Sequence, residues 1–176
     1  MASPPGASRF RGDVGPPVVR GGMAALLPVR MPGVRPWAGR ERTSVAPDPA
    51  LRPGPQIGVD LIAVSRVRRV FEGKPALLAT VFTEEELRYS TRQRRPFMHL
   101  AARFAAKEAA LKALGTGLTG RMAWRDVETV HGPWAEPRLI LRGEVARLAR
   151  ARGLHRCAVS LSHAGGYAMA AVIFTG

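Results

Sequence analysis

The sequence is poor in cysteine, in aromatic residues and in long apolar runs. Of its 176 residues only Cys157 is a cysteine, which excludes an intramolecular disulfide and fits a reducing compartment such as the cytoplasm. No apolar run approaches the roughly 18 residues of a membrane-spanning helix, so we expect no membrane association. Only 6% of the residues are aromatic. This length is typical of one folded domain.

Acidic residues are also scarce. There are 13 of them against 27 basic residues, a net charge of +14, and all the basic residues except three lysines are arginines. Such a surface attracts acidic partners. A high isoelectric point is also the first sign of a nucleic-acid-binding module. That alternative depends on charge alone, because the sequence shows neither zinc ligands nor an aromatic stacking platform, and we predict no nucleic acid as a partner.

The composition changes near residue 55. Residues 1–55 are crowded with proline, glycine and arginine and lack any sustained period, so we expect a disordered extension. An organelle transit peptide is an open alternative, as is a natural start at Met23 or Met31. Residues 56–176 have the composition of a folded domain with an adequate aliphatic core. The chain shows no internal repeat.

A strong helix is predicted at about residues 96–114, where alanine, leucine, lysine, glutamate and arginine dominate. One stripe of this helix is apolar and should face the core. Glu108 and Lys112 lie one turn apart at the margin of that stripe. They are either a simple pair of opposite charges at i and i+4 or part of a site, because a carboxylate beside a buried face needs a partner. The stripe consists of Leu100, Phe104, Leu111 and Leu114.

Two further segments contain polar residues in apolar surroundings. Asp60 lies in a β-branched run at 56–64 that is typical of a buried strand. Asp60 either caps the helix that follows or must be neutralised by a partner or a cation. His163 ends the first strand of a predicted hairpin at 159–172, where side chains are often presented to a site, although a lone histidine at such a position more often has a structural role.

The coarse pattern predicts an α+β fold with a mainly antiparallel sheet packed on the long helix. Thr83-Glu84-Glu85-Glu86 matches a capping box and should start a short helix. The remaining predicted elements are a strand at 56–62, a helix at 64–72, strands at 126–130 and 137–142 joined through His131-Gly132-Pro133, a helix at 143–151 and the final hairpin.

Three fragments in this order resemble the holo-acyl-carrier-protein synthase family, a branch of the 4′-phosphopantetheinyl transferases. They are Ile57-Gly58-Val59-Asp60-Leu61, then Arg103-Phe104-Ala105-Ala106-Lys107-Glu108-Ala109 with Lys112, and finally Ser160-Leu161-Ser162-His163 followed by Tyr167-Ala168. Each fragment alone is a weak signal, but the three in order are specific. The resemblance covers roughly residues 56–176.

The resemblance implies a transferase that moves 4′-phosphopantetheine from coenzyme A to a serine of apo-acyl carrier protein and releases adenosine 3′,5′-bisphosphate. Fatty acid biosynthesis is the implied setting. A polyketide or peptide-synthetase carrier domain is the alternative client, and the sequence does not separate the two. The resemblance also implies the phosphopantetheinyl transferase fold and a homotrimer with active sites shared between neighbouring subunits.

The resemblance assigns a metal site to two carboxylates. Asp60 and Glu108 are implied to hold Mg²⁺, and Lys112 is implied to reach the coenzyme A phosphates. Such roles agree with the chemistry, because Mg²⁺ is commonly held by one or two carboxylates together with waters and substrate phosphates. Glu108 and Lys112 are therefore the predicted catalytic residues. Glu108 acting through a metal-bound water is one option for the general base, which stays open.

Further basic residues are implied to bind the substrates. His163 would line the nucleotide pocket, and Arg95 and Arg103 would contact coenzyme A phosphates. Arg66 and Arg69, on the helix after Asp60, would meet the acidic carrier protein; a solvated basic face is the alternative for them.

The sequence departs from the family pattern at Ala63. Members of the family commonly have a glutamate at this position, three residues after the metal-binding aspartate. Its replacement removes a carboxylate near the predicted ion.

Overall fold

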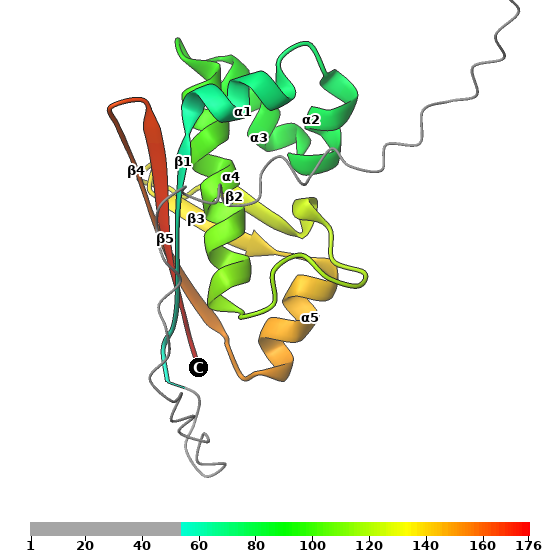
Figure 1. The fold of residues 1–176 in the computed structure, drawn as a ribbon. Helices are drawn as coiled ribbons and strands as arrows, with labels where there is room; N and C mark the ends of the chain where they lie inside the picture. Colours follow the sequence, from blue (N-terminus) through cyan, green and yellow to red (C-terminus); the bar gives the residue numbers. More distant parts are fainter. Residues whose placement is uncertain (1–53) are drawn as a thin grey trace, which may run out of the picture. The chain divides into compact units, whose positions relative to one another are not determined.

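The computed structural model describes residues 54–176, so the prediction for residues 1–55 lies outside it except for the last two positions. The first strand is followed by a run of helices, the longest of which lies in the middle of the fold, and the other strands come later in the chain (Figure 1). In chain order the elements are β1 (Gln56–Ala63), α1 (Val64–Phe71), α2 (Pro75–Val81), α3 (Glu84–Thr91), α4 (Pro96–Ala113), a 3₁₀ helix (Trp124–Asp126), β2 (Val127–His131), β3 (Pro137–Leu141), α5 (Gly143–Ala151), β4 (Arg156–Ala164) and β5 (Tyr167–Thr175).

The strands form two antiparallel sheets. The larger has the order β1-β5-β4, and β1 pairs with β5 in a register that sets Asp60 opposite Ala170. The smaller consists of β2 and β3, with Glu128 opposite Ile140. This arrangement confirms the predicted α+β class and the antiparallel sheet on a long helix.

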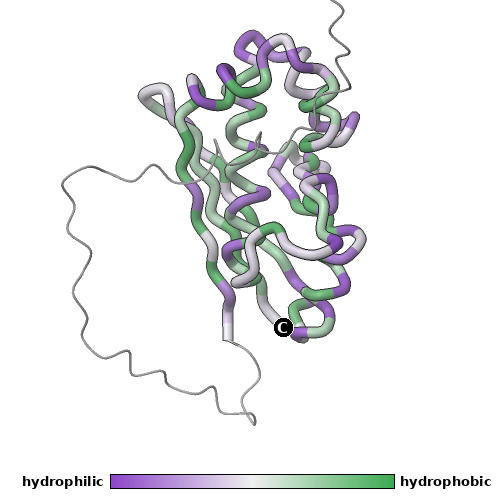
Figure 2. Tube along the Cα trace, turned by 45° about the vertical axis from the view of Figure 1, so that its right-hand side comes forward, coloured by the Kyte–Doolittle hydropathy of each residue, from purple (hydrophilic) through white to green (hydrophobic). Residues whose placement is uncertain are grey.

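Helix α4 is the centre of the packing. All four residues of the predicted apolar stripe are at most 3% exposed, which confirms that face of the helix. The helix is buried on its other sides as well, because most of its alanines are also inaccessible. Alanine adds little bulk, so the sheet and the outer helices can approach the helix closely. Hydrophobic residues follow the strands, while the outer helices and turns mix both kinds (Figure 2).

One prediction about β1 is wrong. The strand was expected to be buried, but its residues alternate between the two faces of the sheet. Gly58 and Ile62 are buried against the molecule, whereas Ile57, Val59 and Leu61 are 63%, 46% and 62% exposed. A strand of hydrophobic residues on both faces is typical of one that is covered on both sides. Within the described residues, only one side of β1 is covered.

The element boundaries were predicted to within two residues for most segments, with three exceptions. The final hairpin runs from Arg156 to Thr175, three residues beyond its predicted limits at both ends. Helix α2 was missed, although Pro75 at its first turn is a common helix start. The β2–β3 turn runs from Gly132 to Glu136, later than predicted, because Gly132 N donates to Glu136 O at 2.8 Å. The capping box is confirmed, since Thr83 and Glu86 exchange side-chain and backbone hydrogen bonds at the start of α3.

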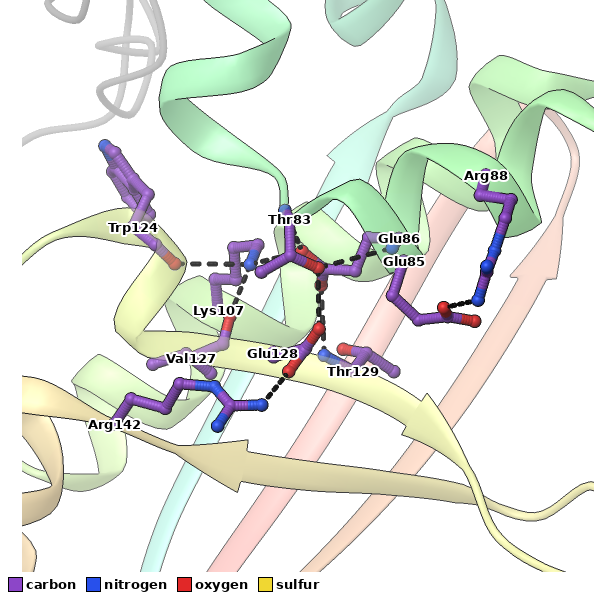
Figure 3. Close-up of polar contacts among 10 residues, drawn as sticks. All are labelled: Thr83, Glu85, Glu86, Arg88, Lys107, Trp124, Val127, Glu128, Thr129 and Arg142. Carbon is purple, nitrogen blue, oxygen red and sulfur yellow. Dashed lines mark hydrogen bonds and ion pairs between the residues drawn. The ribbon is translucent and has the colours of Figure 1, made fainter.

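A buried polar network joins α3, α4 and β2 (Figure 3). Lys107, which is fully inaccessible, lies 2.7 Å from the Glu86 carboxylate and donates to the carbonyls of Trp124 and Val127. The second Glu86 oxygen accepts from Thr129 N at 3.0 Å. A buried charge must be paired and hydrogen-bonded, and both partners here meet that condition. The network therefore fixes these three elements to one another.

Candidate active site

Gly58 brings β1 into direct contact with α4. A Cβ atom at this position would lie 2.0 Å from Ala109 O and 2.6 Å from Ala113 N. Both atoms belong to the helix backbone, which cannot move aside as the end of a flexible side chain could. The absence of a side chain at Gly58 therefore sets how closely the strand approaches the helix. Asp60, two residues later, lies on the same face of the strand.

Asp60 meets Lys112 across this contact. The Lys112 Nζ atom lies 2.6 Å from Asp60 Oδ1 and also donates to Val59 O at 3.3 Å. The Asp60 side chain is only 13% exposed, while that of Lys112 is 51% exposed. Among the described residues, the Lys112 ion pair thus joins two elements and is not the simple i,i+4 pair with Glu108. The capping alternative for Asp60 is also wrong, because the N-cap residue of α1 is Ala63.

Glu108 lies within electrostatic reach of both groups. Burial raises the pKa of its carboxyl, the Asp60 charge raises that pKa further, and Lys112 opposes the shift. A carboxylate whose ionisation is disfavoured by a neighbouring carboxylate is suited to share a cation with it. No group of three or more His, Cys, Asp or Glu side chains able to hold a metal occurs in residues 54–176. A Mg²⁺ ion bound here would therefore depend on water and substrate phosphates as well, which agrees with its usual chemistry.

A cavity of about 740 Å³ opens beside the start of α1. Its walls come from the start of α1, from the segment leading into α4 and from the β4–β5 turn. Arg95 and His163, two of the predicted coenzyme A ligands, line it, and so do Arg94 and Arg68. The structure thus separates the predicted site residues into a carboxylate–lysine cluster (Asp60, Glu108 and Lys112) and a basic cavity wall.

Arg103, the third predicted coenzyme A ligand, is buried at 2% exposure and does not line this cavity. Its guanidinium lies 4.1 Å from the centroid of the Tyr89 ring, and Nη1 donates to His99 O at 3.3 Å. Burial lowers the pKa of Arg103, and the charge of Glu86 opposes that effect. Stacking on an aromatic face stabilises a cation without neutralising it.

Aromatic and histidine side chains connect Arg103 to the cavity. Tyr89 stacks on His131 at a centroid distance of 4.2 Å, and the His99 ring lies 5.7 Å from Tyr89 and 6.3 Å from His163. Burial lowers the pKa of His99, and Arg103 lowers it further. The sequence analysis missed Tyr89, His99 and His131. They come from three separate elements, and no local pattern indicates that they meet.

The arginines predicted to meet the carrier protein, Arg66 and Arg69, both lie on α1. Arg68, between them, lines the cavity, where its guanidinium lies 5.4 Å from the centroid of Phe97 and pairs with Glu72 at 3.1 Å. The helix thus presents one arginine to the cavity, a position that the sequence analysis did not single out.

Residues 56–172 match the family model of the 4′-phosphopantetheinyl transferase superfamily. The chain belongs to this superfamily. It is 49% identical over 121 residues to the holo-[acyl-carrier-protein] synthase of Syntrophotalea carbinolica, an alignment that covers 68% of this chain and 94% of the relative. The resemblance drawn from the three motifs is confirmed, and with it the prediction that the chain is an enzyme of the phosphopantetheinyl transferase class.

Solved structures agree with this assignment. The holo-[acyl-carrier-protein] synthase from Neisseria meningitidis matches with a TM-score of 0.63 and 29% identity, over 69% of this chain and 98% of that one. The ACPS–CoA complex of Chronobacterium ammoniagenes matches with a TM-score of 0.60 and 29% identity, over 70% of this chain and 98% of that one. The predicted phosphopantetheinyl transferase fold is therefore confirmed.

Proposed function

We propose that the protein transfers 4′-phosphopantetheine from coenzyme A to a serine of apo-acyl carrier protein and releases adenosine 3′,5′-bisphosphate. The observation that carries the proposal is the meeting of Asp60, Glu108 and Lys112 from β1 and α4. It is supported by relatives named holo-acyl-carrier-protein synthase and by a solved relative in complex with CoA. The catalytic domain proposed is residues 56–176.

The transfer forms a bond between the serine oxygen and phosphorus and breaks the pyrophosphate bond to the nucleotide. The serine proton leaves to a base, and the leaving group is adenosine 3′,5′-bisphosphate, whose 5′-phosphate keeps the bridging oxygen. Catalysis of such a displacement depends on positioning and on charge near the phosphate oxygens. Lys112, half exposed beside the carboxylates, can supply one positive charge to those oxygens.

Asp60 and Glu108 are the proposed Mg²⁺ ligands. When bound, the ion would neutralise pyrophosphate charge and orient the phosphates for displacement. Gly58 contributes indirectly, because it holds the strand against the helix from which Glu108 comes. Arg95 and His163 line the cavity, and their proposed roles are to contact the coenzyme A phosphates and the nucleotide, respectively. The proposed role of Arg103 is to contact a coenzyme A phosphate. In the structure its guanidinium is buried against the ring of Tyr89.

The acidic carrier protein is proposed to approach α1, which contains Arg66, Arg68 and Arg69 and from which Arg68 lines the cavity. Charge complementarity of this kind steers encounters and raises association rates. The cytoplasm is the proposed location, since Cys157 is a free, exposed thiol.

We also propose a homotrimer. The support is the outer face of the larger sheet, where Ile57, Leu61, Met169 and Tyr167 are 40% exposed or more. A contiguous apolar surface marks an interaction site, and a second copy of the chain fits such a face.

Leu61→Asp should therefore yield smaller particles by light scattering, while Ile140→Asp, at an exposed apolar position of the other sheet, should not. Equal masses for both variants and the wild type would contradict the proposed interface.

The transfer itself is tested by incubating the protein with coenzyme A, Mg²⁺ and purified apo-carriers of the fatty-acid, polyketide and peptide-synthetase types. We expect the mass of a phosphopantetheine arm to appear on a carrier serine, and EDTA to prevent it. The carrier that is modified fastest identifies the client class. No mass gain on any apo-carrier would refute the proposed transfer, and full activity in EDTA would refute the metal site alone.

A further inference from the structure

The ammonium group of Lys112 is bound to the same strand that carries a proposed metal ligand. Its Nζ atom lies 2.6 Å from Asp60 Oδ1 and 3.3 Å from Val59 O. The lysine thus holds one oxygen of a carboxylate that is only 13% exposed. A divalent cation bound by Asp60 and Glu108 would have to bind the other Asp60 oxygen, directly beside the ammonium, or displace the ammonium from this one.

We propose that Lys112 and the divalent cation compete for Asp60, and that the phosphates of coenzyme A end the competition by drawing Lys112 away. This inference rests on the metal site of the proposed function. Lys112 would then act twice. It occupies Asp60 when coenzyme A is absent, and it binds phosphate when coenzyme A arrives.

The charges in the carboxylate–lysine cluster favour such an exchange. With Lys112 in place, an entering divalent cation meets two carboxylates and one ammonium, and the ammonium repels it. The Lys112 side chain is 51% exposed, and an ion pair with an exposed lysine is weak. The lysine stem is also flexible, so the ammonium can leave Asp60 without movement of α4. Pyrophosphate oxygens offer it an acceptor of higher charge.

A coupling between two ligands follows from this exchange. If coenzyme A removes Lys112 from Asp60, it raises the affinity of the site for the cation. Linkage requires that the cation raise the affinity for coenzyme A by the same factor. The metal would therefore bind weakly to the free enzyme and tightly together with its substrate.

The test measures Mn²⁺ binding to the full chain by the electron paramagnetic resonance signal of free Mn²⁺, with and without coenzyme A. Mn²⁺ is a suitable probe because carboxylates, water and phosphates bind it much as they bind Mg²⁺. Three proteins are compared: wild type, Lys112→Met and Lys74→Met. The Lys74 variant is the matched control, because Lys74 is exposed at the start of α2, outside both β1 and α4.

We expect Lys112→Met to bind Mn²⁺ about three- to tenfold more tightly than wild type without coenzyme A, the range that loss of a weak ion pair and of one repulsion predicts. Lys74→Met should match wild type. Coenzyme A should tighten Mn²⁺ binding more in wild type than in Lys112→Met. Thermal unfolding of the three proteins checks that all are folded.

Equal or weaker Mn²⁺ binding by Lys112→Met without coenzyme A would overturn the competition, even if the transferase assay remains positive and EDTA-sensitive. The same coupling in both proteins would overturn the second role of Lys112. Absence of Mn²⁺ binding in every protein, even with coenzyme A, would overturn the metal site and the competition together.

Discussion

Two lysines on one helix differ in almost every physical respect. Lys107 and Lys112 are five residues apart on α4, and each pairs with a carboxylate from another element. Lys107 is inaccessible and its ammonium contacts Glu86 and two backbone carbonyls. Lys112 is 51% exposed and, among residues 54–176, its ammonium is bound to β1. The buried network around Lys107 is inaccessible to ligands. In the carboxylate–lysine cluster, by contrast, the half-exposed ammonium of Lys112 can bind a charged ligand.

On the single helix α4, Lys107 contributes to stability, whereas Lys112 is available for chemistry. A buried ion pair with complete hydrogen bonding resists change because removal of one partner leaves a charge in a medium of low polarity. A half-exposed pair exchanges partners easily, which suits a group that must meet a substrate. We therefore expect substitutions at the two lysines to affect different measurements.

The largest effect on stability is expected for Lys107→Met. The substitution leaves the Glu86 carboxylate buried without its cation, and loss of one partner of such a pair costs about 3–5 kcal/mol of unfolding free energy. Denaturant unfolding monitored by circular dichroism measures this value. The double variant Lys107→Met/Glu86→Gln should recover part of the loss, because no charge then remains buried.

A Lys107→Met variant as stable as wild type would show that the network does not hold α3, α4 and β2 together. Burial lowers the pKa of Lys107, and the charge of Glu86 opposes that shift.

Asp60→Ala and Glu108→Ala test the other side of the comparison. Each removes one of the two proposed metal ligands, so we expect transfer to fall by about a hundredfold or more while the fold is kept. Transfer to apo-carrier protein is followed by mass spectrometry across a range of Mg²⁺ concentrations. Glu144→Ala, at a carboxylate that pairs with Arg147 on α5 and does not line the cavity, is the control. Wild-type Mg²⁺-dependent turnover in either variant would remove that residue from the metal site.

Lys112→Met can be compared directly with Lys107→Met, because the same residue type replaces a lysine in both variants. Its unfolding free energy should change by less than about 1 kcal/mol, since the lysine of the ion pair that it breaks is half exposed. Turnover should fall more than carrier affinity does, if the charge acts mainly on the phosphate. Initial rates at several carrier concentrations separate the two. A loss confined to carrier affinity would place Lys112 outside the reacting centre.

The helix, the capping box and most strands could be predicted because their signals are local. The apolar stripe of α4 and the Thr83–Glu86 spacing are each contained in one segment. The pairing of Lys107 with Glu86 joins residues 21 positions apart on two helices, and no periodic pattern in the sequence indicates it.

For the candidate site too, residues within local motifs could be predicted from the sequence, whereas contacts between separate elements could not. Asp60, Glu108 and Lys112 came from motifs, and the structure brings them together. The histidine–tyrosine contacts around Arg103 depend on the packing of separate elements. The exposure of Ile57 and Leu61 depends on which strand faces are covered, which composition alone does not reveal.

The smallest predicted effect concerns His99, the α4 residue between the cavity and Arg103. Burial, Arg103 and the neighbouring histidines His163 and His131 lower its pKa below the usual 6.5. Between that lowered value and 6.5 the unfolded chain therefore binds more protons than the folded one. Stability rises with pH in such a window and is lost as the pH falls below about 6.5.

His99→Phe keeps a ring beside Tyr89 and cannot be protonated. Its melting temperature should therefore fall less than that of wild type between pH 7 and pH 5.5, as measured by calorimetry. His131, whose pKa burial and Arg103 also lower, remains in the variant, so part of the acid sensitivity should persist. Glu108 has a raised pKa and works in the opposite direction, equally in both proteins. An identical loss in both proteins would show that His99 does not contribute to the acid sensitivity of the fold.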